Sequence, residues 1–153
     1  SEEIPSRMQT RARADLARDL PADHFDVIDG PTAAKPFRLV AAPARSFLNS
    51  TFTETPGSQR REVRPTALIN PADCEALGIA QGDRLTLGNE RGEAIVHAMP
   101  REGQQPGVLV VEGVWPNKHF ENRLGINALT SSEPGFPHGG AVFHDTAVWM
   151  RKA

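Results

Sequence analysis

The sequence predicts a mainly β domain in which short strands close into a barrel, accompanied by one or two short helices. The first observation is that, from Phe37 onward, short apolar runs alternate with turns rich in glycine, proline and asparagine. The second is that about seven such runs, with little helix between them, favour a barrel over a sandwich. The third is size, because 153 residues with 39% hydrophobic content suit one loop-rich domain.

Residues 1–36 differ from the rest of the chain. Ser6 can cap a short helix that runs to about Leu20 along a narrow apolar stripe, and Pro21 would end that helix. An acidic, turn-rich connector follows it. So small an apolar surface docks weakly, and we therefore expect a partly disordered N-terminal linker or helix, followed by a barrel domain over residues 37–153.

The expected strands follow one another at short intervals. Val108–Val111 is apolar at every position, which predicts a central strand buried on both faces. Pro65 allows its strand only an edge or early position. A long polar loop is expected over residues 44–62. The expected strands are residues 37–41, 63–69, 84–88, 93–99, 108–111, 141–144 and 147–150.

One segment of this region carries a full set of helix signals. Asn70 is suited to the N-cap, Pro71 to the first helical position and Gly78 to the end. Cys74 falls inside this helix, where we expect a small buried residue rather than a nucleophile. Residues 89–92 then predict a hairpin turn between two strands.

Charge and composition exclude several classes of protein. With 17 basic and 19 acidic residues, the chain lacks the basic surface of a nucleic-acid-binding protein. A single cysteine excludes an internal disulfide framework and a multi-cysteine metal site. No run approaches the length of about 18 apolar residues that a membrane span needs, and residues 1–3 show no apolar secretory segment. A cytoplasmic and a periplasmic location both stay open.

Catalytic motifs give no stronger lead. The five histidines have no ligand-like spacing, and neither a nucleophile elbow nor a phosphate-binding glycine motif is present. The bond between Gly57 and Ser58 is of a type that can self-cleave to a pyruvoyl group in a barrel loop, but Pro56 before it favours an ordinary turn. The sequence therefore predicts no catalytic residue and no metal ligand in this chain.

Two loops carry more polar side chains than a barrel needs. The first, Ala44–Phe52, places Arg, Ser, Asn and Thr beside two aromatic rings, and the second, Asn122–Ser132, repeats the polar mixture. Amides supply paired donors and acceptors, hydroxyls adapt to either role, and arginine pairs with phosphate. Such surfaces suit a flat polar heterocycle with a phosphate tail, although each loop alone also fits ordinary turns and caps.

The middle of the chain resembles a known family. Residues 63–92 run as a strand, a short helix opening on Pro71, a Leu-Gly-Ile triplet, a Gly-Asp turn, a second strand and an Arg-Gly hairpin. This order resembles the C-terminal molybdopterin-dinucleotide-binding domain of molybdopterin oxidoreductases, the dimethyl sulfoxide reductase and formate dehydrogenase superfamily. Residues 45–52 and 125–130 resemble the two cofactor-facing loops of that family, and residues 139–146 resemble its closing segment.

The resemblance implies a six-stranded double-psi β-barrel and a parent enzyme that holds molybdenum or tungsten between two pyranopterin guanine dinucleotides. The metal's protein ligand and the redox chemistry would lie outside this chain, which would bind and orient the cofactor. Arg45 would balance pyrophosphate charge, Trp115 would border the cofactor, and amide and hydroxyl groups would bond pterin or guanine edges. The cofactor-binding residues that the resemblance implies are Arg45, Ser46, Asn49, Ser50, Thr51, Trp115, Asn127, Thr130 and Gly140.

Two other functions stay open beside this one. The chain could be a free-standing barrel that binds other proteins, or a pyruvoyl-dependent decarboxylase cleaved between Gly57 and Ser58. In the family interpretation, its partners are the remaining domains of the parent oxidoreductase and the pterin dinucleotide, without nucleic acid and without a membrane segment in this chain. The isolated chain is then expected to be catalytically inactive.

Overall fold

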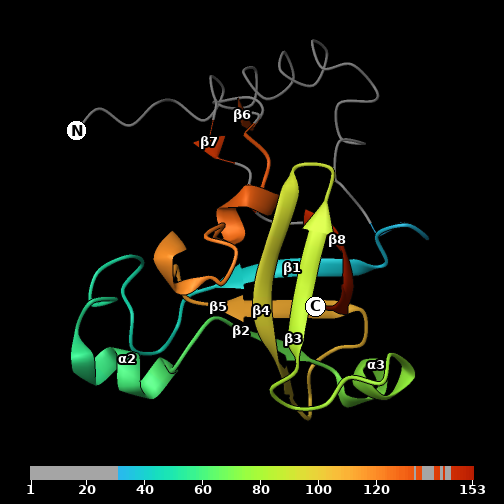
Figure 1. The fold of residues 1–153 in the computed structure, drawn as a ribbon. Helices are drawn as coiled ribbons and strands as arrows, with labels where there is room; N and C mark the ends of the chain where they lie inside the picture. Colours follow the sequence, from blue (N-terminus) through green and yellow to red (C-terminus); the bar gives the residue numbers. More distant parts are fainter. Residues whose placement is uncertain (1–30, 133, 136–139, 142, 144–145) are drawn as a thin grey trace, which may run out of the picture.

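The computed structural model describes residues 31–132, 134–135, 140–141, 143 and 146–153. Within this part, six strands form a closed barrel in the order β1-β5-β2-β4-β3-β8 (Figure 1). The barrel strands are β1 (Phe37–Ala42), β2 (Thr66–Ile69), β3 (Arg84–Asn89), β4 (Gly92–Pro100), β5 (Val108–Glu112) and β8 (Thr146–Lys152). The two-residue strands β6 (Pro134–Gly135) and β7 (Gly140–Ala141) pair with each other outside the barrel.

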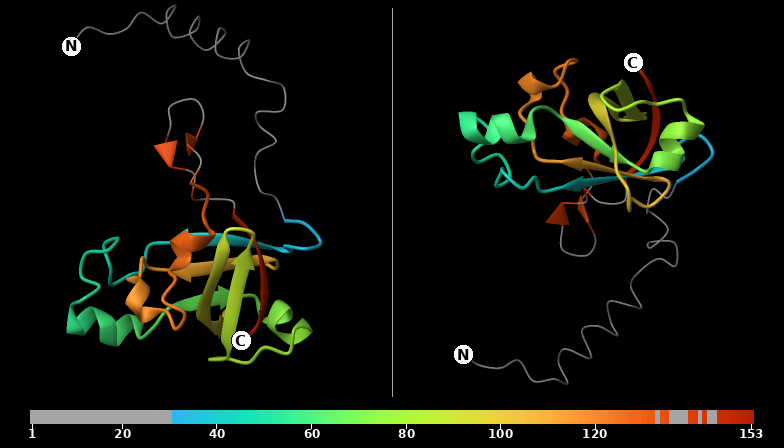
Figure 2. Two further views of the ribbon diagram at one scale, coloured as in Figure 1. Left: turned by 45° about the horizontal axis from the view of Figure 1, so that its top comes forward. Right: turned by 90° about the horizontal axis from the view of Figure 1, so that it is seen from below.

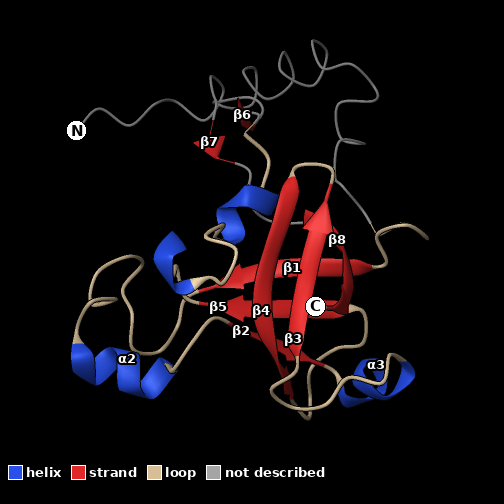
Figure 3. Ribbon diagram, in the orientation of Figure 1, coloured by secondary structure: helices blue, strands red, loops and turns tan. Residues whose placement is uncertain are grey.

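Four short helical segments connect these strands. They are the α-helices α2 (Pro56–Glu62) and α3 (Pro71–Ala76) and the 3₁₀ turns η1 (Asn117–His119) and η2 (Ile126–Leu129). Figures 2 and 3 show α2 and α3 at opposite ends of the barrel. The cap of α3 is as the sequence predicts, because the Asn70 side chain accepts a hydrogen bond from the Ala72 amide at 2.8 Å.

The barrel contains two parallel strand pairs. β1 runs parallel to β5, and β2 runs parallel to β4, whereas every other neighbouring pair in the barrel is antiparallel. Along the chain, β1 leads to β2 and β5 leads to β8, and neither pair lies side by side in the barrel, so both connections are long rather than tight hairpins. The predicted fold, a mainly β six-stranded double-psi barrel with short helices, is confirmed.

The core is the interior of the barrel: burial alternates along β4 and β5, whereas β2, β3 and β8 each carry three or four buried residues in a row. In β4, Ala94, Val96 and Ala98 are buried, while Ile95 and His97 between them are partly exposed. Cys74 is also buried, with 4% of its surface exposed, as the sequence predicts. The largest fully buried side chains are Phe120, Leu39, Ile69, Leu85, Leu87, Leu109, Leu129, Val96, Val111 and Val148.

The prediction that residues 108–111 are buried on both faces is wrong. β5 does lie inside the barrel order, between β1 and β2, but its burial alternates: Leu109 and Val111 are buried, whereas Val108 and Val110 are only partly covered. A barrel strand turns one face to the core, and its other face needs a helix or loop to be buried. Val110 keeps part of its surface exposed, so an apolar run of four residues does not by itself indicate two buried faces.

The long loop expected over residues 44–62 contains a helix that the sequence analysis missed. Pro56 begins α2, no side chain caps it, and none of its residues is buried. A helix without an apolar stripe gives no periodic signal, so its sequence looks like a polar loop. The following strand also starts later than residue 63: Val63 has a φ of 64°, and regular pairing begins at Thr66.

The two closing strands have different outcomes. Residues 147–150 lie within β8, which pairs with both β1 and β3 and closes the barrel. Ala141 instead belongs to β7 and pairs with Pro134, so its expected place in a barrel strand is wrong. Val142 and His144 lie outside the described residues, as does the helix expected between Ser6 and Leu20.

Candidate functional site

The segments that follow β1 and β5 leave the same end of the barrel because these two strands are parallel neighbours. Ala42 and Glu112, the last residues of β1 and β5, are paired in register. One residue further on, the Gly113 amide donates a hydrogen bond to the Ala42 carbonyl at 2.8 Å. In Figure 1 both arrowheads point to the side where α2 and the first loop lie. The topology therefore brings together segments about 70 residues apart in the sequence.

A packed aromatic contact joins the first polar loop to the segment that follows β5. The rings of Phe47 and Trp115 meet edge-on, with centroids 4.7 Å apart, and both residues are 5% exposed. Gly113 makes this contact possible: its φ is +89°, and a Cβ there would lie 3.0 Å from the Phe47 ring and 3.1 Å from the Ala44 Cβ. The base of the site is thus rigid and largely closed to solvent.

The tip of the first loop is a tight turn that exposes two polar residues. Leu48 and Thr51 exchange backbone hydrogen bonds of 3.1 and 2.9 Å, with Asn49 and Ser50 between them. Asn49 adopts a φ of 52°, in the left-handed region that asparagine tolerates better than most residues. The Thr53 hydroxyl donates to the Ser50 carbonyl at 2.8 Å, which holds the chain where it leaves the turn.

Helix α2 braces this loop from behind. The Ser46 amide donates to the Glu62 carboxylate at 2.7 Å, and the Gln59 side-chain amide donates to the Thr53 carbonyl at 2.8 Å. Sequence reasoning missed both supporting residues because it missed the helix. A Pro followed by helix-compatible polar residues, Ser58–Arg60, was the signal that could have indicated it.

The second loop presents Asn127 on a short 3₁₀ turn. Its neighbours Ile126 and Leu129 are buried at 4% and 0% exposure, so the turn is anchored and Asn127 is left exposed. The Thr130 hydroxyl donates to the Asn127 carbonyl at 3.0 Å, which caps the turn. Upstream, the Asn117 side chain accepts a hydrogen bond from the Gly125 amide at 3.1 Å.

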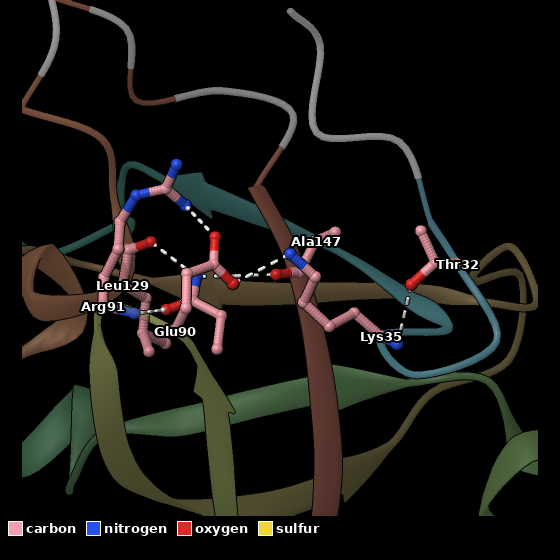
Figure 4. Close-up of polar contacts among 7 residues, drawn as sticks. Thr32, Lys35, Glu90, Arg91, Leu129 and Ala147 are labelled. Carbon is pink, nitrogen blue, oxygen red and sulfur yellow. Dashed lines mark hydrogen bonds and ion pairs between the residues drawn. The ribbon is translucent and has the colours of Figure 1, made fainter.

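The turn between β3 and β4 holds this 3₁₀ turn in place. The Asn89 side chain donates to the Leu129 carbonyl at 2.8 Å and accepts from the Arg91 amide at 2.9 Å. At the same turn, Figure 4 shows Glu90 paired with Lys35 at 2.8 Å and with Arg91 at 3.3 Å. The turn that the sequence predicted as a plain hairpin therefore also supports the second loop.

An acidic residue joins the end of the first loop to η1, which precedes the second loop. The Glu54 carboxylate, after the first loop, lies 2.7 Å from Lys118 Nζ and 3.7 Å from His119 Nε2, both in η1. The hydrogen bond from Lys118 is the main cause that lowers the pKa of Glu54. His119 also packs edge-on against Trp115, with ring centroids 5.2 Å apart. The segment after β5 is thus fixed to the first loop at several points.

The candidate residues fall into three groups. Arg45, Asn49, Ser50, Thr51 and Asn127 are exposed, and the structure shows no hydrogen bond to any of these side chains within the described residues. A second group is committed to the protein itself. Ser46 bonds Glu62 through its amide, Thr130 caps a turn, and Trp115 is buried against Phe47. The place of Trp115 beside the cofactor stays a prediction.

Gly140 forms the third group and lies in β7, paired with Gly135. Within the described residues, no hydrogen bond or ion pair joins the 48–51 turn to Asn127 or Thr130, so the two turns are separate polar surfaces. The described part of the chain also contains no group of three His, Cys, Asp or Glu side chains that could hold a metal ion.

A groove of about 240 Å³ lies behind the first loop, between the end of α2 and the outer faces of β2 and β4. Arg61, Arg64, His97, Met99 and Trp115 are among the residues that line it. Of the predicted site residues, Trp115 alone contributes to this groove. No pattern in the sequence indicates this groove.

His97 is the partly buried titratable group of this groove. Burial is the main cause that lowers the pKa of His97, and the positive charge of Arg64 lowers this pKa further. Its Nε2 lies 3.4 Å from the Glu121 carboxylate, and its Nδ1 is buried without a hydrogen bond of normal geometry to any described residue. The neutral ring is therefore the form that this site favours.

None of the helices in the described ranges has the length and apolar content needed to cross a membrane.

Comparison with known proteins gives a specific result. A model of the family described as "Molydopterin dinucleotide binding domain" matches residues 37–147. The probable oxidoreductase YoaE of Bacillus subtilis (strain 168) is 36% identical over 117 residues, covering 76% of this chain and 17% of the relative. The dimethyl sulfoxide reductase DmsA of Escherichia coli (strain K12) is 30% identical over 121 residues, covering 76% of this chain and 15% of the relative.

Solved structures agree on the fold. Acetylene hydratase from Pelobacter acetylenicus superposes with a TM-score of 0.66 at 16% identity, covering 78% of this chain and 18% of that chain. The chain spans only 11–18% of the length of the curated relatives. The family match covers most of the described barrel, including both polar loops up to the last strand. The chain therefore belongs to the molydopterin dinucleotide binding domain family, in the form found in oxidoreductases of the dimethyl sulfoxide reductase type.

Proposed function

We propose that the loops after β1 and β5 hold the pterin dinucleotide of a larger molybdenum or tungsten oxidoreductase, whose remaining domains are the partners of this chain. In this proposal residues 37–153 form the binding domain and residues 1–36 form a linker. The observation that carries it is a pair of exposed polar turns: the turn around Asn49 follows β1, and the turn around Asn127 is anchored by its buried neighbours and by Asn89 of the β3–β4 turn.

The chemistry of the exposed groups fits this ligand. The amides of Asn49 and Asn127 each provide a donor and an acceptor, which match the hydrogen-bonding edges of pterin and guanine. The hydroxyls of Ser50 and Thr51 provide adaptable partners, and Arg45 provides a guanidinium for pyrophosphate. These side chains are exposed and have no hydrogen bond to described residues, so they are available to a ligand.

Strained backbone supports the same location. Three non-glycine residues with positive φ lie in or beside the two loops: Asn49 at 52°, Phe52 at 70° and Arg123 at 59°. Residues held in such conformations are concentrated at ligand-binding sites, where the surrounding structure must hold them. Here the α2 brace and the Phe47–Trp115 contact supply that support.

In this proposal the chain binds and orients, and it does not itself react. When bound, the pterin dinucleotide carries the metal at which the redox step takes place. Asn49 and Asn127 fix the heterocycle edges, Arg45 balances phosphate charge, and the buried Phe47 packs against Trp115 at the base of the first loop. The isolated barrel would be inactive, because no catalytic group is assigned to it.

The alternative of a pyruvoyl decarboxylase loses its structural basis. Gly57 and Ser58 lie in the first turn of α2, and Gly57 does not have a positive φ. Self-cleavage needs a strained bond that an adjacent hydroxyl can attack, and a helical turn does not provide one. The intact mass of the purified chain tests this directly, since cleavage between Gly57 and Ser58 would give two fragments.

The proposed function is tested in the oxidoreductase that contains this barrel. Asn127→Ala removes an exposed amide that would bond the heterocycle, and we expect the loss of a buried hydrogen bond worth about 1–3 kcal/mol. Pterin and metal content per protein should fall, while the thermal unfolding of the barrel stays unchanged because the Asn127 side chain makes no hydrogen bond to the described residues.

The matched control is Asn122→Ala, which removes an amide from the same loop. The Asn122 side chain donates to the Glu93 carbonyl at 2.8 Å, a bond within the protein. This variant should lower stability and leave the cofactor content of the folded protein near normal. Full pterin and metal loading in Asn127→Ala would overturn the proposed site.

A further inference from the structure

The groove behind the first loop has the properties of a protein-binding surface. Its volume of about 240 Å³ lies below the range of about 300–1,000 Å³ typical of small-molecule sites. Large apolar side chains stand exposed on its lining, with Val63 71% and Met99 42% exposed, while the buried Trp115 closes it. Tryptophan, methionine and arginine are the residues that protein interfaces favour.

The charges of the groove also indicate a protein partner. Arg61 and Arg64 line it and make no ion pair within the part of the chain that the structure describes. Glu62 and Glu112 line it as well, and Glu62 is already bonded to the Ser46 amide. A phosphate site would be uniformly positive, whereas a mixed lining around an apolar centre matches the polar rim of a protein interface.

The backbone holds the groove open at a strained residue. Val63 has a φ of 64° and a ψ of −61°, and the Arg64 amide donates to the Glu62 carbonyl at 2.7 Å across it, which closes a γ-turn. A β-branched residue is disfavoured in this conformation. The strain keeps an apolar side chain in solvent, where it contributes nothing to the core of the barrel.

We propose that this groove docks a neighbouring domain of the same oxidoreductase, through a segment that places an aspartate or glutamate on Arg64 and an apolar side chain against Val63 and Met99. This inference rests on the proposed function, because it requires the larger enzyme. The chain spans 11–18% of its curated relatives, so in an enzyme of their length more than four-fifths of the polypeptide is available to cover this surface.

The groove adjoins the cofactor loop, which gives the docking a consequence. Glu62 lines the groove and bonds Ser46, while Trp115 lines it and packs on Phe47. A domain seated in the groove would thus contact the two residues that support the first loop. Docking and the placement of the loop are then mechanically linked.

The test is the reactivity of a thiol introduced at position 63. The chain has one native cysteine, Cys74, which is buried, so Val63→Cys adds one exposed thiol. The labelling rate with a maleimide is measured by peptide mass spectrometry in the 153-residue chain and in the full oxidoreductase. We expect the introduced thiol to react at least ten times more slowly in the full enzyme. Equal rates would overturn the proposal.

A charge reversal tests the acidic contact. In the full enzyme carrying Val63→Cys, Arg64→Glu should restore fast labelling, whereas Arg101→Glu should not. Arg101 is a matched control because it is also exposed, directly follows β4 and has no ion pair within the described residues. Unchanged protection with Arg64→Glu would overturn the acidic partner segment.

Two further readouts distinguish a domain of the same enzyme from a second copy of the chain, and the docking surface from the cofactor site. Slow labelling of the 153-residue chain that depends on its own concentration would show that a second copy covers the groove, which overturns the proposal. Pterin content is measured in the same full-enzyme samples. If the introduced thiol is protected but no pterin is bound, the docking surface is supported and the proposed function is rejected. If pterin is bound but the thiol is unprotected, the proposed function is supported and the docking surface is rejected.

Discussion

The ring of Phe47 meets the ring of Trp115 edge-on, 4.7 Å between centroids and 84° between planes, at the point where two distant segments leave the barrel. Phe47 follows β1 and Trp115 follows β5, so this contact ties the first candidate cofactor loop to the segment after β5. Each of the two residues has only 5% of its surface exposed, so neither ring offers an open face to a ligand. Their role is to hold the base of the first loop in place.

Removal of one ring of this pair should destabilise the protein. Phe47→Ala leaves a cavity between the loops, and we expect the free energy of unfolding to fall by about 3–5 kcal/mol. Phe52→Ala in the same loop is the control, because Phe52 is 55% exposed and its loss should cost less than about 0.5 kcal/mol. Urea unfolding of both variants measures the difference. Equal effects would show that the Phe47 contact does not order the loop.

Two glycines should respond in opposite directions to alanine. At Gly88 in β3, an added Cβ would overlap the ring of Trp149, so Gly88→Ala should lower the melting temperature by several degrees. At Gly57 in α2, nothing lies within 4 Å of the position of a Cβ, and alanine should stabilise the helix by up to about 1 kcal/mol. Thermal unfolding of the two variants measures both effects, and a neutral Gly88→Ala would contradict the close packing of Trp149.

Acidification should remove the contribution of Asp83. The hydrogen bond from Lys152 at 2.8 Å and that from the Ala80 amide hold the pKa of Asp83 below its ordinary value of 3.8. Because the pKa is lower in the folded state, the stabilisation is complete above the unfolded-state pKa and is lost as the pH falls through the folded-state pKa. The carboxylate is accessible to solvent, so the effect is small and sensitive to salt.

This pH dependence can be measured with Asp83→Asn. The difference in unfolding free energy between the native protein and the variant should be constant from pH 7 down to about pH 5 and should shrink below that. A difference that grows with acidification would mean that Asp83 is protonated more readily in the folded protein than in the unfolded chain.

The sequence predicted the barrel and α3 because their signals are local. Asn70 and Pro71 mark a helix start by their own chemistry, and the hairpin at residues 89–92 lies between two strands with apolar runs. Helix α2 had no such signal, since none of its residues is buried. The alternating exposure of Val108 and Val110 could not be predicted either, because it depends on what other elements cover the barrel.

The candidate site was predictable in composition and not in arrangement. The amides of Asn49 and Asn127 were expected at the cofactor, and both are exposed. The burial of Trp115 depends on Phe47 from a loop far away in the sequence, so no local pattern could show it. The groove at Arg64 and His97 forms between α2, β2 and β4, and such a surface becomes visible only when the fold is known.

The most direct test of the central claim is an NMR titration of the 153-residue chain with guanosine diphosphate and with a pterin. We predict that amide shifts concentrate on Asn49, Ser50, Asn127 and Thr130, with weak affinity because only part of the cofactor's contact area remains in one domain. Asn49→Ala and Asn127→Ala should each weaken the shifts. Shifts clustered at α3, on the opposite end of the barrel, or no difference between the native chain and these variants, would contradict a cofactor site on these loops.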